Sequence, residues 1–419
     1  MMLKPANMIC ALVFALALGA TAARAQECPP NGASVDGVTD KLPELKKDAQ
    51  GGAAAPVVWP DKIEVQLGFT IYVHIKQLGA FLECQKKLQP VKNIVLFLAQ
   101  NQLGNVVGMQ TGAPDKDGGG FLRFTLVRTT PGKDVKDAWV PILGRPWLSP
   151  KRDIAVSVGL ADQYPINSSA NPIDFRTVPQ IDFTIALVFF AVLLGCFGYA
   201  VYRSNILRDA TTEGAGGTGA FSLSKTQAAV WFFVILGSYM LIAAVTGEFN
   251  GTLTATALTL IGIGAATSAG SAIVSASQDA GSDVDKQKTT IAKIKTDLDA
   301  KRTYVAALSG PLVGTIPTEG AIKKAQAELD SLELLYKKAT NQSIGFINDI
   351  LSDANGINFH RFQMVGWTLV LSFIFIKEVW EKLGMPDFDG NLLALQGISA
   401  ATFVGLKLTE PTVPNQPKT

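Results

Sequence analysis

The sequence predicts a multi-domain membrane protein. We expect an all-α transmembrane bundle of five helices, preceded by an exported β-sandwich-like domain and interrupted by a cytoplasmic helical hairpin or coiled coil. Hydrophobic residues make up 48% of the 419-residue chain and charged residues only 17%, and nearly all of the charge lies in 26–180 and 277–361. The remainder consists largely of long apolar runs, and two apolar hairpins among them read as copies of each other. Together these observations predict soluble parts on both sides of a bilayer.

The first 25 residues have the layout of a secretory signal peptide. Lys4 precedes an apolar run from Met8 to Ala22, and the small-residue cleavage pattern Ala23-Arg24-Ala25 follows. An uncleaved first membrane helix is the alternative, although the run is short for a span. We therefore expect 26–56 to be a flexible exported leader, because it is rich in Gly, Ala, Asp and Lys.

Two of the four cysteines belong to the part of the chain that we expect to be exported. An oxidising compartment allows Cys28 and Cys84 to form a disulfide, and two free thiols are the alternative. Cys10 lies in the signal peptide. Cys196 lies in an apolar span, where a small apolar side chain is the simpler interpretation.

Residues 57–180 predict an exported β domain. Several short segments alternate apolar and polar residues, and clusters of Gly, Pro, Asp and Asn separate them. The expected strands are Ile63–Leu67, Phe69–Ile75, Ile94–Leu98, Phe121–Val127 and Ile154–Leu160. This pattern is typical of a small antiparallel sandwich, for example of the immunoglobulin-like kind.

Five apolar segments are long enough to cross a bilayer. The first is 183–203, and the other four form two hairpins over 225–276 and 360–408. Arg203, Arg208 and Lys225 lie in or beside the linker 204–224, and many Lys and Arg lie between the hairpins, which places both regions in the cytoplasm. Both hairpins then enter the membrane from the cytoplasm as parallel repeats, and the tail 409–419 is cytoplasmic. The Gly-rich linker lacks the Gly-Lys-Ser/Thr ending of a phosphate loop, so we exclude nucleotide binding there.

The segment 277–359 between the hairpins predicts cytoplasmic helices. Apolar residues recur at heptad spacing in two runs, and Gly310-Pro311 and Ile316-Pro317 separate the runs. An antiparallel helical hairpin within one chain satisfies this pattern. A coiled coil between subunits is the alternative.

Each membrane hairpin begins with the same pattern of a basic residue, a glutamine and a tryptophan. The two copies are Lys225, Gln227 and Trp231, and Arg361, Gln363 and Trp367. A basic residue beside the headgroups and a tryptophan at the interface are typical membrane anchors. The glutamines predict a different role, because an amide at the membrane edge can bond to a neighbouring helix. Ligand binding by the glutamines is the alternative.

The second helix of each hairpin carries small residues at every fourth position. They are Gly262, Ala266 and Gly270 in the first copy, and Gly397, Ala401 and Gly405 in the second. Residues four apart share a helix face, so each stripe predicts a surface that allows close backbone approach. We therefore expect these two helices to form the packed centre of the bundle. Lining of a pore in an oligomer is the alternative, although no Asp or Glu lies deep in a span.

The sequence carries no catalytic or metal-binding constellation that we recognise. Its two histidines, His74 and His360, lie outside any Cys/His metal spacing. We find no serine elbow, carboxylate pair or kinase signature. The formal net charge of +2 gives no reason to expect nucleic acid as a partner. We therefore expect a non-enzymatic protein without cofactor or bound metal.

Several motifs resemble those of a widespread family of bacterial multi-pass inner-membrane proteins. The similarity rests on the duplicated hairpin, in which Lys/Arg-x-Gln-x3-Trp is followed by Gly-Ile-x-Ala-Ala-Thr or a close variant, and on Leu351–Gly356, His360–Gln363 and Met385–Phe388. It covers most of 90–410 and implies no catalytic residues. Gln396 departs from it, because the resemblance leads us to expect an apolar residue there.

The organisation predicts a periplasmic binding or sensing domain that a five-helix bundle couples to a cytoplasmic coiled-coil scaffold. The expected partners are the lipid bilayer, an envelope protein or ligand, and further copies of the chain. An oligomeric channel or transport component, with spans three and five near its axis, is the alternative.

Overall fold

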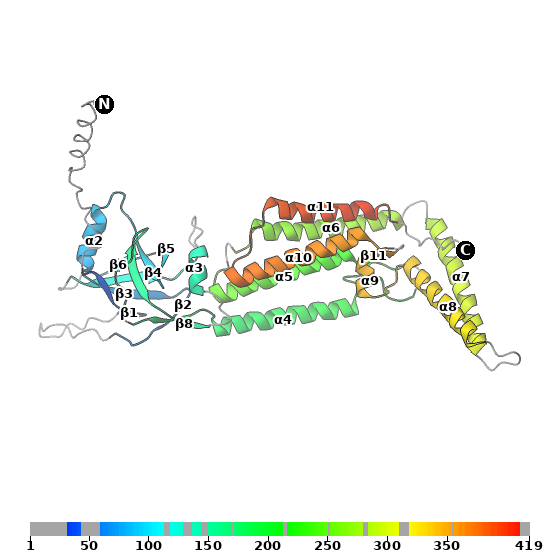
Figure 1. Ribbon diagram of the computed structural model, residues 1–419, viewed down its shortest axis with the longest axis horizontal. Helices are drawn as coiled ribbons and strands as arrows, with labels where there is room; N and C mark the ends of the chain where they lie inside the picture. Colours follow the sequence, from blue (N-terminus) through cyan, green and yellow to red (C-terminus); the bar gives the residue numbers. More distant parts are fainter. Residues whose placement is uncertain are drawn as a thin grey trace, which may run out of the picture. The chain divides into compact units, whose positions relative to one another are not determined.

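The structure is a computed structural model that describes residues 32–42, 59–112, 118–128, 136–143, 150–169, 171–212, 216–249, 252–279, 284–309, 318–353 and 356–410. The chain divides into two compact units, Met1–Thr177 and Val178–Thr419. The first is rich in β-strands and the second is helical, as expected (Figure 1). The expected signal peptide lies outside the described residues, as does nearly all of the tail.

Three sheets form the described part of the first unit. Their orders are β1 (Ser34–Thr39), β3 (Thr70–Lys76), β7 (Gly120–Thr125) and β6 (Met109–Thr111); β5 (Asn101–Val107), β4 (Ile94–Leu98) and β9 (Val156–Leu160); and β2 (Glu64–Gln66), β10 (Ile173–Arg176) and β8 (Lys151–Ile154). Neighbouring strands are antiparallel except β2 and β10, which are parallel. Two short helices, α2 (Leu78–Lys87) and α3 (Lys136–Leu143), accompany the sheets.

Burial in the strands follows their apolar pattern. In β3, Ile71, Val73 and Ile75 are fully buried and the residues between them are partly exposed, because side chains alternate between the two faces of a strand. All of β4 is buried, and so is all of its neighbour β9. The period-two pattern therefore predicted β3 well, whereas β4 is a continuous apolar run.

The expected flexible leader contains a strand. β1 lies within 26–56 and pairs with β3 from Ser34 to Thr39, which corrects the expectation for this stretch. The strand has a bulge between Val35 and Gly37. A Cβ atom on Gly37 would lie 2.1 Å from the Trp59 ring, so the glycine lets the indole pack directly on the strand. Composition alone did not reveal this pairing.

The second unit contains eight described helices and one short β-hairpin. They are α4 (Gln180–Arg203), α5 (Leu223–Thr246), α6 (Ala255–Asp279), α7 (Val284–Ser309), α8 (Glu319–Ala339), α9 (Phe346–Leu351), β11 (Ser352–Asp353), β12 (Gly356–Ile357), α10 (Phe359–Lys382) and α11 (Gly390–Lys407). Four described helices are long and apolar enough to cross a membrane, namely α4, α5, α6 and α10. The expected fifth span, α11, is not among them; it has 18 residues, including Asn391, Gln396 and Lys407.

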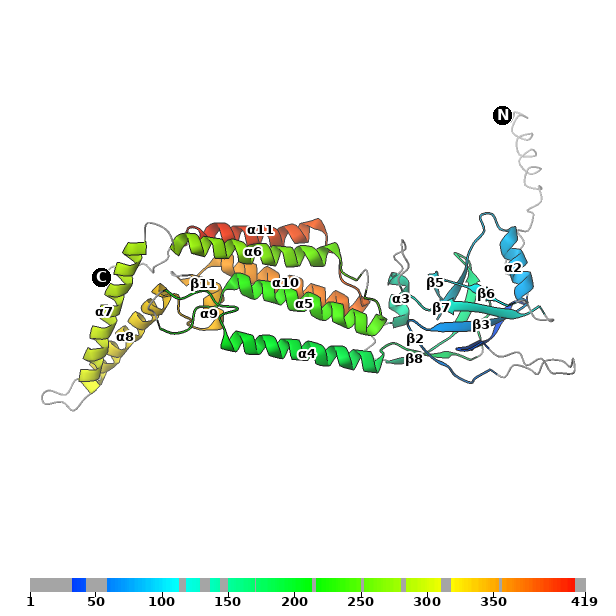
Figure 2. The same ribbon diagram turned by 180° about the vertical axis from the view of Figure 1, so that it is seen from behind.

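Four helices of the second unit close a ring. α5 packs against α6, α6 against α11, α11 against α10, and α10 against α5 (Figures 1 and 2). The packed centre is thus shared by all four helices. The two helices that were expected to form the packed centre, α6 and α11, therefore share it with α5 and α10.

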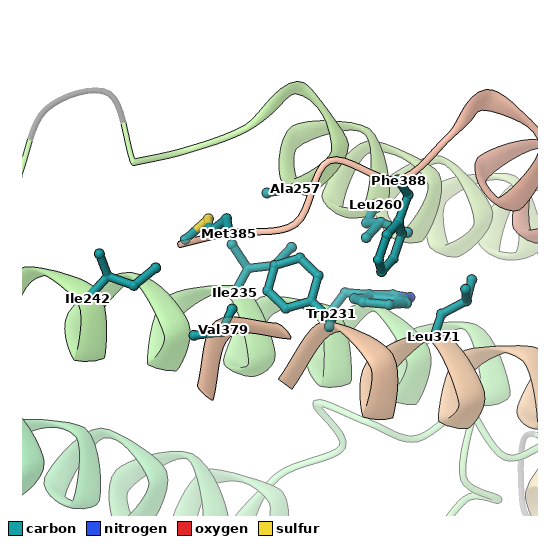
Figure 3. Close-up of a cluster of buried hydrophobic side chains, with 10 residues drawn as sticks. Trp231, Ile235, Ile242, Ala257, Leu260, Leu371, Val379, Met385 and Phe388 are labelled. Atoms are coloured by element: carbon teal, nitrogen blue, oxygen red, sulfur yellow. The ribbon is translucent and has the colours of Figure 1, made fainter. Parts of the chain in front are cut away.

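An aromatic and aliphatic cluster fills one part of this ring. Trp231 lies 6.3 Å from Phe375, and Phe375 lies 6.1 Å from Phe388, measured between ring centroids (Figure 3). Residues from α5, α6, α10 and the loop after α10 complete it: Ile235, Ile242, Ala257, Leu260, Leu371, Val379 and Met385. Because this cluster joins three helices of the ring, we expect it to be a main source of packing stability.

α4 differs from the other apolar helices, because none of its residues is buried. It packs on α5 through aromatic contacts of Phe190 and Phe197 with Phe233. A helix whose apolar side chains are exposed on most sides is suited to lipid.

α7 and α8 lie side by side along their lengths (Figures 1 and 2). Ile294, Leu298 and Val305 of α7 are buried together with Ala325 of α8. These positions belong to the expected heptad runs, and pairing within one chain is the arrangement that the structure contains.

Candidate functional site

The helix ring has a polar interior toward one end. We call this the motif end, because α5 and α10 begin there with the repeated pattern, and α6 and α11 finish there. The aromatic cluster lies further along the ring. The polar interior comprises side chains from all four helices: Ser224, Gln227, Thr267, Ser271, Thr368, Ser372, Gln396, Ser399 and Lys407, each buried.

A layer of two amides and one hydroxyl connects three of the helices. The Gln227 Nε2 atom on α5 donates to Thr368 Oγ1 on α10 at 3.0 Å, and Gln396 Nε2 on α11 donates to the same oxygen at 3.3 Å. The Thr368 hydroxyl in turn donates to the carbonyl of Met364 at 2.8 Å. We call Gln227, Thr368 and Gln396 the amide layer. Its hydrogen bonds fix the register of three helices where shape alone allows sliding.

The second glutamine of the repeated pattern is less enclosed. Gln363 is partly exposed, and its Nε2 atom donates to Ser399 Oγ on α11 at 3.5 Å, which is a long hydrogen bond. The tryptophans differ in the same way, because Trp231 is fully buried and Trp367 is partly exposed. Only the first copy of the pattern therefore points both side chains into the ring. The interface-anchor interpretation does not fit Trp231.

The basic residues of the pattern contact protein carboxylates. The Lys225 Nζ atom donates to the carbonyl of Arg208 at 2.6 Å and lies 3.3 Å from the Asp209 carboxylate. Arg361 forms two parallel hydrogen bonds with Glu410, at 3.2 Å and 2.8 Å. Both side chains of the second pair are mostly buried, at 12% and 15% exposed. Both basic residues therefore have carboxylate partners within the chain.

Lys407 adds a buried cation that the sequence-based reasoning overlooked. Its Nζ atom donates to Ser271 Oγ at 3.0 Å and lies 3.8 Å from Asp209, the carboxylate that Lys225 also approaches. Ser224 donates to the same Ser271 hydroxyl at 3.0 Å. Asp209 thus joins the loop after α4 to α5 and α11. A lysine at the last position of an apolar helix was the available signal.

The small-residue stripes mostly face outward. Gly262, Ala266, Ala401 and Gly405 are exposed, which corrects the expectation that the stripes form the packed surface. Two members are exceptions: a Cβ atom on Gly270 would lie 3.2 Å from Val404, and one on Gly397 would lie 4.0 Å from Ile263. A close approach of two helix backbones involves Gly264 instead, where a Cβ atom would lie 3.2 Å from the Cα atom of Ala228. The buried face of α6 is therefore rotated away from the predicted one.

A hydrogen-bonded collar joins the end of α8 to the loop before α5. Backbone bonds link Thr212 to Thr340, Ala220 to Asn341 and Ser343 to Thr218. The buried Asp349 carboxylate accepts from the Ser343 hydroxyl at 2.6 Å, from the Ile344 amide at 2.9 Å and from the Phe221 amide at 3.1 Å. We call 205–212, 216–222 and 340–349 the collar. The described residues of the expected Gly-rich linker are thus a folded part of the unit.

The remaining candidate residues give a mixed result. Cys84 is disulfide-bonded and Cys196 is a free, exposed thiol. Cys28, the expected partner of Cys84, lies outside the described residues, so that pairing stays a prediction. Across the part of the chain that the structure describes, we find no group of three or more His, Cys, Asp or Glu side chains arranged to hold a metal ion.

Comparisons of this chain with family models, with curated proteins and with solved structures find no match. Any function must therefore be argued from the geometry described above.

Proposed function

We propose that this chain is a non-enzymatic coupling scaffold of the bacterial inner membrane. Its β-rich unit is a periplasmic sandwich that binds an envelope protein or ligand. The membrane bundle has five spans, which are α4, the first hairpin of α5 and α6, and the second hairpin of α10 and α11. The α7–α8 pair is a cytoplasmic coiled-coil element that receives a partner. The motif resemblance to multi-pass inner-membrane proteins supports the same proposal.

The collar is the observation that carries this function. It bonds the chain that follows α8 to the loop that connects α4 with α5. A displacement of α4 relative to the ring therefore acts directly on the base of the helical pair. A flexible tether would not require a buried aspartate whose carboxylate accepts three hydrogen bonds.

The packing of the ring supports a scaffold over a channel along its axis. Trp231, Phe375 and Phe388 fill the interior beyond the amide layer. The small-residue stripes of α6 and α11 point mostly away from the interior of the ring. They therefore do not line a path along the axis of the ring within one chain. A tightly packed interior transmits a displacement between helices, because such packing deforms little.

Site-specific crosslinking tests the proposal. A photoreactive amino acid replaces Leu334, an exposed apolar residue of α8, in the full-length protein in cells. The scaffold account predicts one discrete adduct with a cytoplasmic protein, and it predicts that Asp349→Ala abolishes this adduct while the protein stays in the membrane. The matched control carries the photoreactive group at Lys323, an exposed charged position of the same helix.

Electrical recording tests the channel alternative. Purified full-length protein in planar bilayers should give no conductance above the lipid background. Unitary current steps that scale with protein amount, together with the absence of an adduct at position 334, would overturn the scaffold in favour of the channel.

A further inference from the structure

We propose that the amide layer binds a single water molecule inside the helix ring, between α5, α10 and α11. This inference does not rest on the coupling function, because it concerns the interior of the bundle alone.

Four buried polar atoms beside this layer have no hydrogen-bond partner within the described protein. They are Gln227 Oε1, Gln396 Oε1, Trp231 Nε1 and Ser372 Oγ. Their residues are 2%, 0%, 0% and 7% exposed, in the same order. Buried polar groups in proteins are nearly always hydrogen-bonded, either to protein or to ordered water. Four such atoms in one neighbourhood therefore require a common explanation.

The helix geometry places these side chains on facing sides of neighbouring helices. Gln227 and Trp231 are four residues apart on α5, and Thr368 and Ser372 are four apart on α10, so each pair shares a helix face. The two hydrogen bonds to Thr368 Oγ1 then join α5, α10 and α11 at this level. Figure 3 shows the indole nitrogen of Trp231 on the side of Leu371, which lies between Thr368 and Ser372 in the sequence. Along α5 this direction leads from Ile235 past Trp231 toward the start of the helix, where Gln227 lies.

The chemistry of the four atoms complements one water molecule. The two amide oxygens accept, and the indole N–H and the Ser372 hydroxyl donate. Water donates two hydrogen bonds and accepts two, so it can satisfy the whole set, and buried waters typically make about three such bonds. A monovalent cation fits poorly, because the indole presents a donor and none of the hydrogen bonds of the layer involves a carboxylate. Water therefore matches both the number and the direction of the groups.

The side chains around the amide layer determine from which side this water exchanges with solvent. Trp231 and Phe375 close the ring on one side. On the other side, Ser399, Ser271 and Lys407 continue as buried polar residues to the motif end. The repeated Gln-x3-Trp pattern is then a water-binding pair in its first copy. The second copy, whose side chains are partly exposed, is not.

A double-mutant cycle on the purified full-length protein tests this site. Trp231→Phe removes the donor and Gln396→Met removes an acceptor, and no direct hydrogen bond joins the two side chains. If one water bridges them, the double variant loses about as much in thermal midpoint as the worse single variant, and not the sum of both. The matched control pairs Trp231→Phe with Gln363→Met, for which the losses should add. Should Trp231→Phe fail to fold, Ser372→Ala takes its place in both cycles.

Additive losses in the Gln396 cycle would overturn the proposal. So would a thermal midpoint of the unmutated protein that depends on whether Na⁺, K⁺ or a bulky organic cation is present at equal ionic strength, because that result assigns the site to a cation. An experimental density map that resolves other buried waters should show a peak within hydrogen-bond distance of both amide oxygens. Direct pairing of the amides with no such peak would likewise contradict the site.

Discussion

Gln227 and Gln363 occupy equivalent positions in the two hairpins, yet their surroundings differ. Gln227 is buried and bonds to Thr368, whereas Gln363 is partly exposed and reaches Ser399 only at 3.5 Å. The sequence could predict an amide that bonds to a neighbouring helix. It could not predict which copy lies inside, because that depends on how the hairpins pack against each other. The role of Thr368 could not be predicted from the sequence either, because one threonine in an apolar helix gives no sign that two amides bond to it.

The cysteines give a direct prediction at this scale. Cys84 is disulfide-bonded and Cys196 is free. With Cys28 as the partner of Cys84, thiol titration of the denatured, unreduced mature protein should find one reactive thiol, and reduction should raise the number to three. The variant Cys196→Ala should lower the unreduced value to zero. Three thiols before reduction would contradict the pairing.

The pair of Arg361 and Glu410 separates protein contacts from lipid contacts. Glu410→Gln removes the charge from a bidentate and mostly buried pair, so we expect a loss of about 1.5–3 kcal/mol in unfolding free energy. Glu381→Gln, at an exposed position of α10, is the control and should change little. Chemical denaturation in nanodiscs measures both variants. If anionic lipid were the main partner of Arg361, Glu410→Gln would have no effect and removal of anionic lipid would destabilise the protein.

At the element scale, the sequence predicted segments better than faces. Long apolar runs marked α4, α5, α6 and α10, because a span needs about 20 apolar residues whatever it packs against. The small-residue stripe on α6 failed as a packing signal. The buried face runs instead through Leu260, Gly264, Thr267 and Ser271, which also have the spacing of one helix face. Two faces of α6 both have the residue spacing expected of a packing face, and only the tertiary contacts show which of them is buried.

The strands β2, β8 and β10 share an exposed ion-pair group whose charges depend on pH. Glu64 on β2 bonds to Lys151 on β8 at 2.5 Å and to Arg176 on β10 at 2.8 Å. The hydrogen bond from Lys151, and then the charge of Arg176, lower the pKa of Glu64 below its ordinary value of 4.5. A carboxyl whose pKa is lowered by folding stabilises the folded state above its unfolded pKa. That contribution is lost as the pH falls through the folded pKa.

We therefore predict that Glu64→Gln reduces the loss of stability of these strands as the pH falls. Between about pH 6 and pH 3, local hydrogen exchange of β2, β8 and β10, corrected for its intrinsic pH dependence, should accelerate less in the variant than in the unmutated full-length protein. Glu83→Gln, at an exposed position of α2, should behave like the unmutated protein. Equal acid responses in all three proteins would contradict this role of Glu64.

For the whole molecule, the division into a β-rich unit and a helical unit could be predicted because charge and apolar residues segregate along the chain. The closure of the ring and the collar could not. Both depend on contacts between segments more than a hundred residues apart, such as Phe221 with Asp349 and Ser271 with Lys407. No local pattern specifies such pairs. The leader shows the same limit, since β1 exists through its pairing with β3.

The crossing of α11 is a prediction about the whole topology. Five spans place the two ends of α11 on opposite sides of the membrane. Single cysteines at Asn391 and Thr409, both exposed in the structure and introduced with Cys196→Ala, should react with a membrane-impermeant maleimide from opposite sides in oriented vesicles. Labelling of both positions from one side would show that α11 does not cross.

The collar is central to the proposed coupling, and a distance measurement between spin labels tests it most directly. One label replaces Lys323 on α8 and the other replaces Ile398 on α11, with Cys196→Ala in the full-length protein in nanodiscs. We predict a narrow distance distribution that Asp349→Ala broadens, because the substitution removes the acceptor of three hydrogen bonds. The exposed variant Asp330→Ala on α8 should leave the distribution narrow. A broad distribution in the protein with Asp349 intact, or one that Asp349→Ala leaves unchanged, would contradict the account.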